Sequence, residues 1–314
     1  MSRPPLSYLR IAVTSRCNLR CVYCRPAEAP DEPDTLRADE IVRFVHLAVQ
    51  CGIRKVRLTG GEPLVREDIL DLVARIAAIP ELHDLGLTTN GTLLPTLAQP
   101  LRRAGLARIN IGLPAVDPQV YHRITRIGTA DEALAGLQAA LDAGFHPIKV
   151  NTVVMRGIND GEVPALARLT RDAPIDVRFI EYMPFGAEPT DRQDYLVPAG
   201  EVLERLRQLG PVEPLDEDRG PASARRYRIE GHRGTVGIIA PHSAPFCRAC
   251  NRVRLTAEGR LRACLIDGGE QDILALIRSG LDRPAMERLL AEAAALKPPQ
   301  HTGAFRGRMH HIGG

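Results

Sequence analysis

The sequence predicts an α/β protein in which six βα units form a parallel sheet. Short segments rich in β-branched residues alternate with longer stretches of helical period, which is the signature of repeated βα units. The 314 residues are enough to bury a substantial core, and 44% hydrophobic with 25% charged residues is the balance of an ordinary globular protein. A fibrous or a disordered chain is therefore disfavoured.

Each expected strand is a short run that ends at a turn or polar residue. The six strands are Tyr8–Thr14, Val56–Thr59, Leu85–Thr89, Arg108–Leu113, Ile148–Val154 and Val177–Tyr182. Between them, apolar residues at three- and four-residue intervals predict helices near Ala38–Gln50, Glu67–Ile79, Leu93–Ala104, Asp131–Ala143 and Glu162–Arg171.

The βα rhythm breaks near residue 190. A helix near Glu201–Leu209, a linker rich in Pro, Asp and Arg, and a β-rich segment follow, and then a last helix and a tail. We therefore expect two regions, residues 1–190 and residues 191–314. The unusual motifs CNLRCVYC, GGEP, TTNG and EYMP all follow expected strands, and ligand sites of parallel barrel-like sheets form at the carboxyl ends of strands.

Six of the seven cysteines fall into two tight groups, which in a reducing compartment are typical of metal or cluster ligands. In the first group, Cys17, Cys21 and Cys24 have the spacing CxxxCxxC. Three thiolates can ligate three irons of a [4Fe–4S] cluster and leave the fourth iron open to a small molecule. The alternative is a zinc site that lacks a fourth ligand.

The second group, Cys247, Cys250 and Cys264, spans an expected hairpin. If Ala257–Gly259 is a three-residue loop with Gly259 in the left-handed region, Thr256 faces Arg260 and Arg252 faces Cys264. Alternation then places two cysteines and three arginines on one face: Cys250, Arg252, Arg254, Arg262 and Cys264. A second three-cysteine cluster beside an anionic ligand is the preferred interpretation. A zinc site completed by His242 and a solvated Arg-rich hairpin remain open alternatives.

The composition argues against two other classes. A net charge of +3 and 4% aromatic residues without Trp do not suit a nucleic-acid-binding surface. The N-terminus lacks the apolar core of a secretory signal, and no apolar run reaches membrane-spanning length. We therefore expect a cytoplasmic protein with no nucleic-acid or membrane partner.

CNLRCVYC, GGEP and the six βα units together resemble the radical S-adenosylmethionine superfamily and its partial (β/α)6 TIM-like barrel. The resemblance implies that the first cysteines hold a [4Fe–4S] cluster that cleaves S-adenosylmethionine. It also implies that Tyr23 packs near the adenine, that the Gly61 loop offers backbone to the methionine amino group, and that Met183 contacts this cofactor.

The segment CxxCNRxRLTxxGxLxxCL and the terminal Ile-Gly-Gly resemble one branch, the GTP 3′,8-cyclase family of molybdenum cofactor biosynthesis. The resemblance implies a lyase that forms (8S)-3′,8-cyclo-7,8-dihydroguanosine 5′-triphosphate from GTP. A second [4Fe–4S] cluster on Cys247, Cys250 and Cys264 binds the guanine, and Gly313 and Gly314 reach into the barrel for the radical step. The implied GTP contacts are Arg10, Arg57, Thr88, Lys149, Arg252 and Arg254.

The resemblance also implies a flavodoxin- or ferredoxin-like reductant and a downstream cyclic pyranopterin monophosphate synthase, and it leaves a homodimer open. One segment departs from the family pattern, because Gly112 and Pro114 stand where a Ser and an Asp are usual. A radical maturase acting on a peptide is the rival enzyme. We expect His310 and His311 to be exposed near the terminus and assign them no role.

Overall fold

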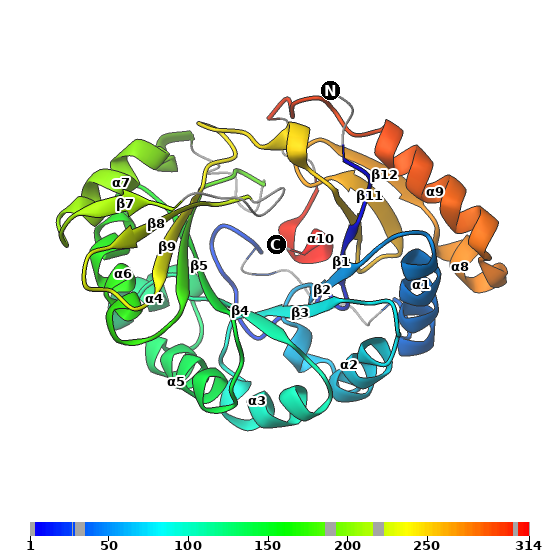
Figure 1. The fold of residues 1–314 in the computed structure, drawn as a ribbon, viewed down its shortest axis with the longest axis horizontal. Helices are drawn as coiled ribbons and strands as arrows, with labels where there is room; N and C mark the ends of the chain where they lie inside the picture. Colours follow the sequence, from blue (N-terminus) through cyan, green and yellow to red (C-terminus); the bar gives the residue numbers. More distant parts are fainter. Residues whose placement is uncertain are drawn as a thin grey trace.

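The computed structural model describes residues 4–26, 28, 35–185, 193–215, 223–303 and 307–313. Within these residues one sheet has the strand order β12-β11-β10-β1-β2-β3-β4-β5-β6-β9-β8-β7 (Figure 1). Its centre is the expected set of six parallel strands: β1 (Tyr8–Ala12), β2 (Lys55–Thr59), β3 (Asp84–Thr89), β4 (Arg108–Gly112), β5 (Ile148–Val154) and β6 (Asp176–Glu181). The sheet is strongly curved, so that one face becomes the wall of a partial barrel.

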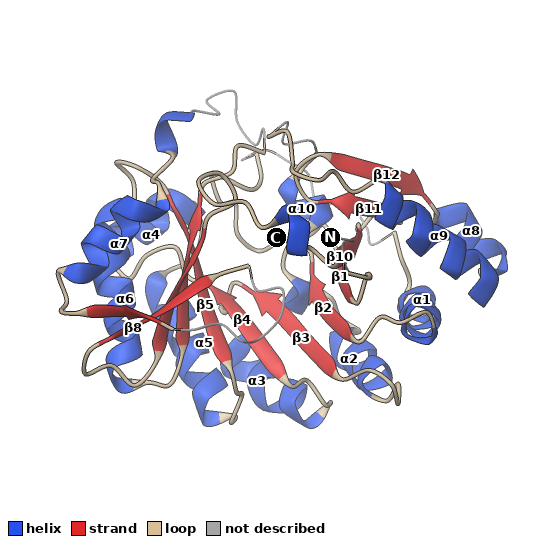
Figure 2. Cartoon of the chain, turned by 45° about the horizontal axis from the view of Figure 1, so that its top comes forward, coloured by secondary structure: helices blue, strands red, loops and turns tan. Residues whose placement is uncertain are grey.

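Helices cover the outer face of this sheet (Figure 2). They are α1 (Ala38–Gln50), α2 (Ile69–Ala77), α3 (Leu94–Arg103), α4 (Pro118–Thr125), α5 (Ala130–Asp142), α6 (Val163–Asp172) and α7 (Ala199–Arg207). The apolar stripe of each packs onto outward-facing strand residues such as Leu9, Ile11 and Val56, all with no exposed surface. Because these side chains bury the outer face, their neighbours along each strand point inward.

The C-terminal part of the chain extends both edges of the same sheet. β9 (Thr235–Ile239) lies parallel to β6 and continues into the antiparallel β8 (Arg225–Ile229) and β7 (Val212–Pro214). At the other edge β10 (Arg252–Leu255) lies parallel to β1, and the antiparallel β11 (Arg260–Cys264) and β12 (Gly268–Asp272) follow. The strand that follows Cys250, β10, therefore pairs directly with β1, the strand that precedes the first cysteine group.

Three helices form the C-terminal part of the described chain. α8 (Leu274–Gly280) and α9 (Arg283–Ala295) contact α1, and α10 (Met309–Ile312) lies inside the curve of the sheet (Figure 1). No helix in the described ranges is long and apolar enough to cross a membrane.

The expected helices form within a few residues of their positions, but several elements were not predicted, among them α4 and β7. α4 begins where Asp117 caps the helix through the backbone N–H groups of Gln119 and Val120, with Pro118 at the first helical position. This Asp-Pro start signal is visible in the sequence. Part of the segment interpreted as a linker also forms β7, a short strand at the edge of the sheet that pairs with β8.

Candidate functional site

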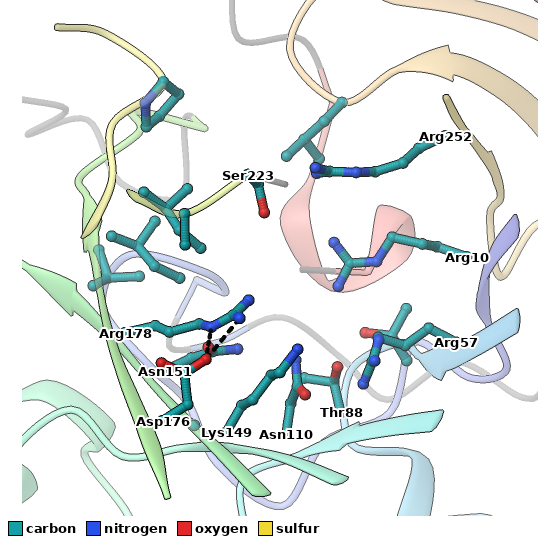
Figure 3. Close-up of a pocket in the computed structure, with 18 of the residues that line it drawn as sticks. Arg10, Arg57, Thr88, Asn110, Lys149, Asn151, Asp176, Arg178, Ser223 and Arg252 are labelled. Atoms are coloured by element: carbon teal, nitrogen blue, oxygen red, sulfur yellow. Dashed lines mark hydrogen bonds and ion pairs between the residues drawn. The ribbon is translucent and has the colours of Figure 1, made fainter. Parts of the chain in front are cut away.

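A cavity of about 1380 Å³ occupies the inside of the partial barrel. Fifteen predicted site residues line it: Arg10, Arg57, Thr88, Lys149, Arg252, Arg254, Tyr23, Gly61, Met183 and the six grouped cysteines. Figure 3 shows the labelled side chains of seven strands and of the loop before β8 around one space, with Arg10 and Arg252 opposite Arg178. Residues more than 200 positions apart in the sequence therefore line one cavity.

Strand register aligns three arginines in one row across the cavity wall. Arg254 of β10 pairs with Arg10 of β1, which pairs in turn with Arg57 of β2. Neighbouring strands are about 4.8 Å apart, and like charges placed directly opposite each other destabilise a sheet. Burial and the charges of Arg10 and Arg252 hold the pKa of Arg254 well below its usual range. The row is therefore matched to an anionic ligand.

A second row lies nearer the middle of the sheet and contains Thr88, Asn110, Lys149 and Asp176. Burial, reinforced by Arg178 and Arg57, lowers the pKa of Lys149 to about 7. Among the described residues, Thr88 Oγ1, Asn110 Oδ1 and Asn151 Oδ1 are buried oxygens without a hydrogen-bond partner in the protein. Such groups are costly unless a ligand or water satisfies them.

The first cysteine group occupies the loop after β1. Backbone N–H groups of Arg20 and Val22 donate to the carbonyl oxygens of Thr125 and Ile124, which fixes this loop on the C-terminal end of α4. Burial raises the pKa of Cys17 to about 12 and that of Cys21 to about 11. Thiolates at these positions need a compensating positive centre, which bound iron supplies.

The GGEP loop after β2 is fixed against the first cysteine loop. The Gly61 N–H donates to the Thr14 carbonyl, and a Cβ at Gly61 would lie 2.2 Å from the Arg16 carbonyl oxygen. The buried Glu62 carboxylate accepts hydrogen bonds from the N–H groups of Leu64 and Asn90 and from the Thr89 hydroxyl. Only glycine at position 61 allows the GGEP loop to approach the backbone of the cysteine loop this closely.

The second cysteine group lies on a hairpin that has the expected register. Arg254 pairs with Arg262, the Thr256 N–H donates to Arg260, and Gly259 has φ of +80°. Lys297 Nζ lies 3.5 Å from Cys250 Sγ. Burial raises the pKa of Cys250, but Lys297 and Arg252 outweigh it and hold the net pKa below its usual value.

Arg262 plays a different part from the other arginines of the hairpin. Its guanidinium pairs with Glu270 and donates to the carbonyl oxygens of Cys264 and Leu265. It does not line the cavity. The hairpin therefore presents Arg252 and Arg254 to the cavity, while Arg262 braces the loop that carries Cys264.

The tail enters the barrel through α10. The Gly313 carbonyl accepts a hydrogen bond from Arg254 Nη1 at 2.6 Å, and a Cβ at Gly313 would lie 2.3 Å from Thr59. Gly314 lies outside the described residues. The expectation that His310 and His311 are exposed is wrong, because both are buried. His311 Nδ1 lies 2.6 Å from Glu258 Oε1, and the His310 ring packs beside the Cys24 carbonyl.

The described residues contain no group of three His, Cys, Asp or Glu side chains arranged to hold a single metal ion. Three thiolates of one cubane each bind a different iron, whereas the ligands of a zinc ion meet at one metal. His242, the fourth ligand named in the zinc alternative, lies edge-on against the ring of His301.

Several cavity residues were not predicted, among them Tyr8, Asn110, Asn151, Arg178 and Lys297. Tyr8 and Asn151 lie two residues from Arg10 and Lys149 on β1 and β5, so alternation along these strands would have found them. Lys297 follows α9, and no local sequence signal connects it with Cys250.

Comparisons with known proteins define the class first. The model of the radical SAM superfamily matches residues 11–170, and that of the molybdenum cofactor synthesis C-terminal region matches residues 175–303. A crystal structure of Streptococcus suis SuiB bound to S-adenosylmethionine aligns with a TM-score of 0.64 and 16% identity, over 91% of this chain and 68% of that one. At this identity the likeness concerns the fold alone.

Curated relatives then define the branch. The chain is 46% identical to a GTP 3′,8-cyclase of Pelotomaculum thermopropionicum, over 98% of both sequences. It is 45% identical to the Moorella thermoacetica enzyme of that name, over 94% of this chain and 92% of the relative. The chain therefore belongs to the GTP 3′,8-cyclase family of radical SAM enzymes. Membership implies a [4Fe–4S] cluster and S-adenosylmethionine.

Proposed function

We propose that this chain is a radical SAM lyase that converts GTP to (8S)-3′,8-cyclo-7,8-dihydroguanosine 5′-triphosphate, a step of molybdenum cofactor biosynthesis. The observation that carries the proposal is the row formed by Arg254, Arg10 and Arg57 inside a cavity that also contains both cysteine groups. A guanidinium fork grips phosphate oxygens in pairs, so this row suits a triphosphate.

The first site binds the cofactor in this proposal. Cys17, Cys21 and Cys24 hold a [4Fe–4S] cluster, which with bound S-adenosylmethionine supplies a 5′-deoxyadenosyl radical. Tyr23, Gly61 and Met183 line the same cavity as these cysteines, and in this proposal they contact the cofactor. The close fit of Gly61 against the cysteine loop leaves backbone, not a side chain, at the cofactor surface.

The second site binds the substrate. Cys247, Cys250 and Cys264 would hold a second [4Fe–4S] cluster, which would bind the guanine base. The phosphates are bound by Arg10, Arg57, Arg252 and Arg254. Thr88 of β3 and Lys149 of β5 bind the same ligand. The buried oxygens of Thr88, Asn110 and Asn151 support a polar ligand at this wall. Gly313, whose carbonyl oxygen accepts a hydrogen bond from Arg254, and Gly314 serve the radical step in this proposal.

The implied partners follow from this reaction. A flavodoxin- or ferredoxin-like protein donates the electron, and a cyclic pyranopterin monophosphate synthase consumes the product in the cytoplasm. The division near residue 190, into a barrel region and a cluster-bearing region, stays a prediction.

The proposal is tested by incubating the reconstituted protein anaerobically with GTP, S-adenosylmethionine and dithionite. We expect 5′-deoxyadenosine and the cyclised nucleotide in equal amounts, identified by mass spectrometry after dephosphorylation. Cofactor cleavage without any change in GTP would contradict the assignment of the substrate and favour the peptide-modifying alternative.

A further inference from the structure

Tyr8 lies among the cations of the cavity wall, at the start of β1. Strand register places it between Lys55 of β2 and Arg252 of β10. Lys55 Nζ lies 5.0 Å from the centre of the Tyr8 ring, and the guanidinium carbon of Arg252 lies 6.0 Å from it. Both distances are in the range of cation–π attraction. One aromatic ring therefore contacts two cations that come from different strands.

The phenol oxygen of Tyr8 contacts a third cation. Arg57 Nε donates to this oxygen at 2.9 Å, and Arg57 Nη1 lies 3.4 Å from the Leu87 carbonyl. Gly86 lies beneath the guanidinium, where a Cβ would approach both terminal nitrogens to 2.9 Å. The Arg57 side chain is thus held from three sides, and Tyr8 provides the one side-chain hydrogen bond of the three.

The same oxygen also compensates charge. Arg10, Arg57, Lys55 and Arg252 face it from three strands, and burial alone would raise the pKa of Tyr8. The cations outweigh burial and lower this pKa to about 7. The phenol is therefore a strong hydrogen-bond acceptor for Arg57 and reduces the repulsion among the cations.

We propose that Tyr8 is a positioning residue for the anionic part of the substrate, which fixes Arg57 through its phenol oxygen and Lys55 and Arg252 through its ring. Tyr8 acts through these cations, so its contribution grows with the number of phosphates on the ligand. This inference rests on the proposed function, because it assumes that the ligand of the arginine row is GTP.

The test compares Tyr8→Phe, which removes the phenol oxygen and keeps the ring, with Tyr8→Leu, which removes both. GTP, GDP and guanosine binding to the anaerobically reconstituted full-length enzyme are measured by equilibrium dialysis. For Tyr8→Phe we expect GTP affinity to fall roughly ten-fold, as for loss of a hydrogen bond to a charged group, GDP affinity to fall less, and guanosine affinity to stay within about two-fold. Tyr227→Phe, in β8 and outside the cavity lining, is the matched control and should bind like the wild type.

Tyr8→Leu should lose a further few-fold in GTP affinity, because the cation–π contacts are also removed. Unchanged GTP affinity in Tyr8→Phe would overturn the proposal. So would an equal loss for GTP and guanosine, because a purely structural defect does not depend on the phosphates.

A double-mutant cycle with Arg57→Ala separates this inference from the proposed function. If Tyr8 acts through Arg57, the added cost of Tyr8→Phe should be small in the Arg57→Ala background. Additive losses would contradict this route. If Arg57→Ala itself leaves GTP affinity unchanged, the GTP assignment fails, whatever Tyr8 does.

Discussion

The two cysteine groups line one cavity but are built in different ways. The first lies on a loop that backbone hydrogen bonds attach to α4, and burial raises the pKa of Cys17 and Cys21. The second flanks a hairpin that belongs to the sheet. Burial raises the pKa of Cys247 there, but Lys297 and Arg252 lower the pKa of Cys250 despite its burial. The surroundings of Cys250 are therefore electropositive. The difference supports a cofactor role for the first region and an anion-binding role for the second.

The sharpest test of this division replaces one cysteine of each group by alanine, in two separate variants. Cys17→Ala should abolish 5′-deoxyadenosine formation, because the first cluster is the one that reduces the cofactor. Cys264→Ala should keep measurable cofactor cleavage but lose the cyclised product. Each variant should keep about four irons per chain, against about eight for the wild type. If both variants lose cofactor cleavage equally, the division of roles is wrong.

The tail lies beside Arg254 and Thr59, so its removal should suppress cyclisation and leave both clusters in place. Deletion of Gly313 and Gly314 removes the carbonyl that Arg254 holds and should suppress cyclisation strongly, with iron content and thermal stability unchanged. A peptide ending in HHIGG should partly restore the product. Gly314→Ala should be milder than the deletion. A truncated enzyme that cyclises GTP at the full-length rate would exclude this role.

Lys149 predicts a pH dependence of substrate binding. Its pKa is lowered to about 7, and phosphates bound nearby would raise it, so the protonated form binds GTP more tightly. Affinity should therefore fall as the pH rises above 7, by up to about ten-fold per unit while one proton is taken up. Lys149→Met removes this titrating group and should make the decline shallower. Tyr8, whose pKa is also lowered to about 7, should account for the slope that remains. An unchanged slope in this variant would remove Lys149 from the site.

The smallest expected effect concerns the departure at Gly112. A Cβ there would meet only the Thr89 carbonyl oxygen at 3.7 Å, so Gly112→Ser fits without strain. Loss of strand-interior glycine should leave stability equal or higher by roughly 0.5 kcal/mol. The added hydroxyl faces the cavity and should tighten S-adenosylmethionine binding a few-fold, measured by equilibrium dialysis. Weaker cofactor binding would show that the backbone at Gly112 is already used.

The sequence predicted the local features well because their signals are local. The hairpin register at Arg254 and Arg262 followed from one glycine and side-chain alternation, and the strand-end motifs lie where βα geometry requires. Long-range placement was less predictable. No pattern along the chain indicates that β9 and β10 would extend opposite edges of one sheet, or that Lys297 would approach Cys250. The burial of His311 likewise depends on Glu258, which is 53 residues away.

The central claim is that a radical formed at the first cysteine group acts on GTP held at the second. It is tested most directly with GTP that carries deuterium at C3′, incubated anaerobically with the enzyme, S-adenosylmethionine and dithionite. We expect deuterium in the 5′-deoxyadenosine, and its loss when Gly313 and Gly314 are deleted. 5′-Deoxyadenosine without deuterium, formed alongside unchanged GTP, would contradict the account.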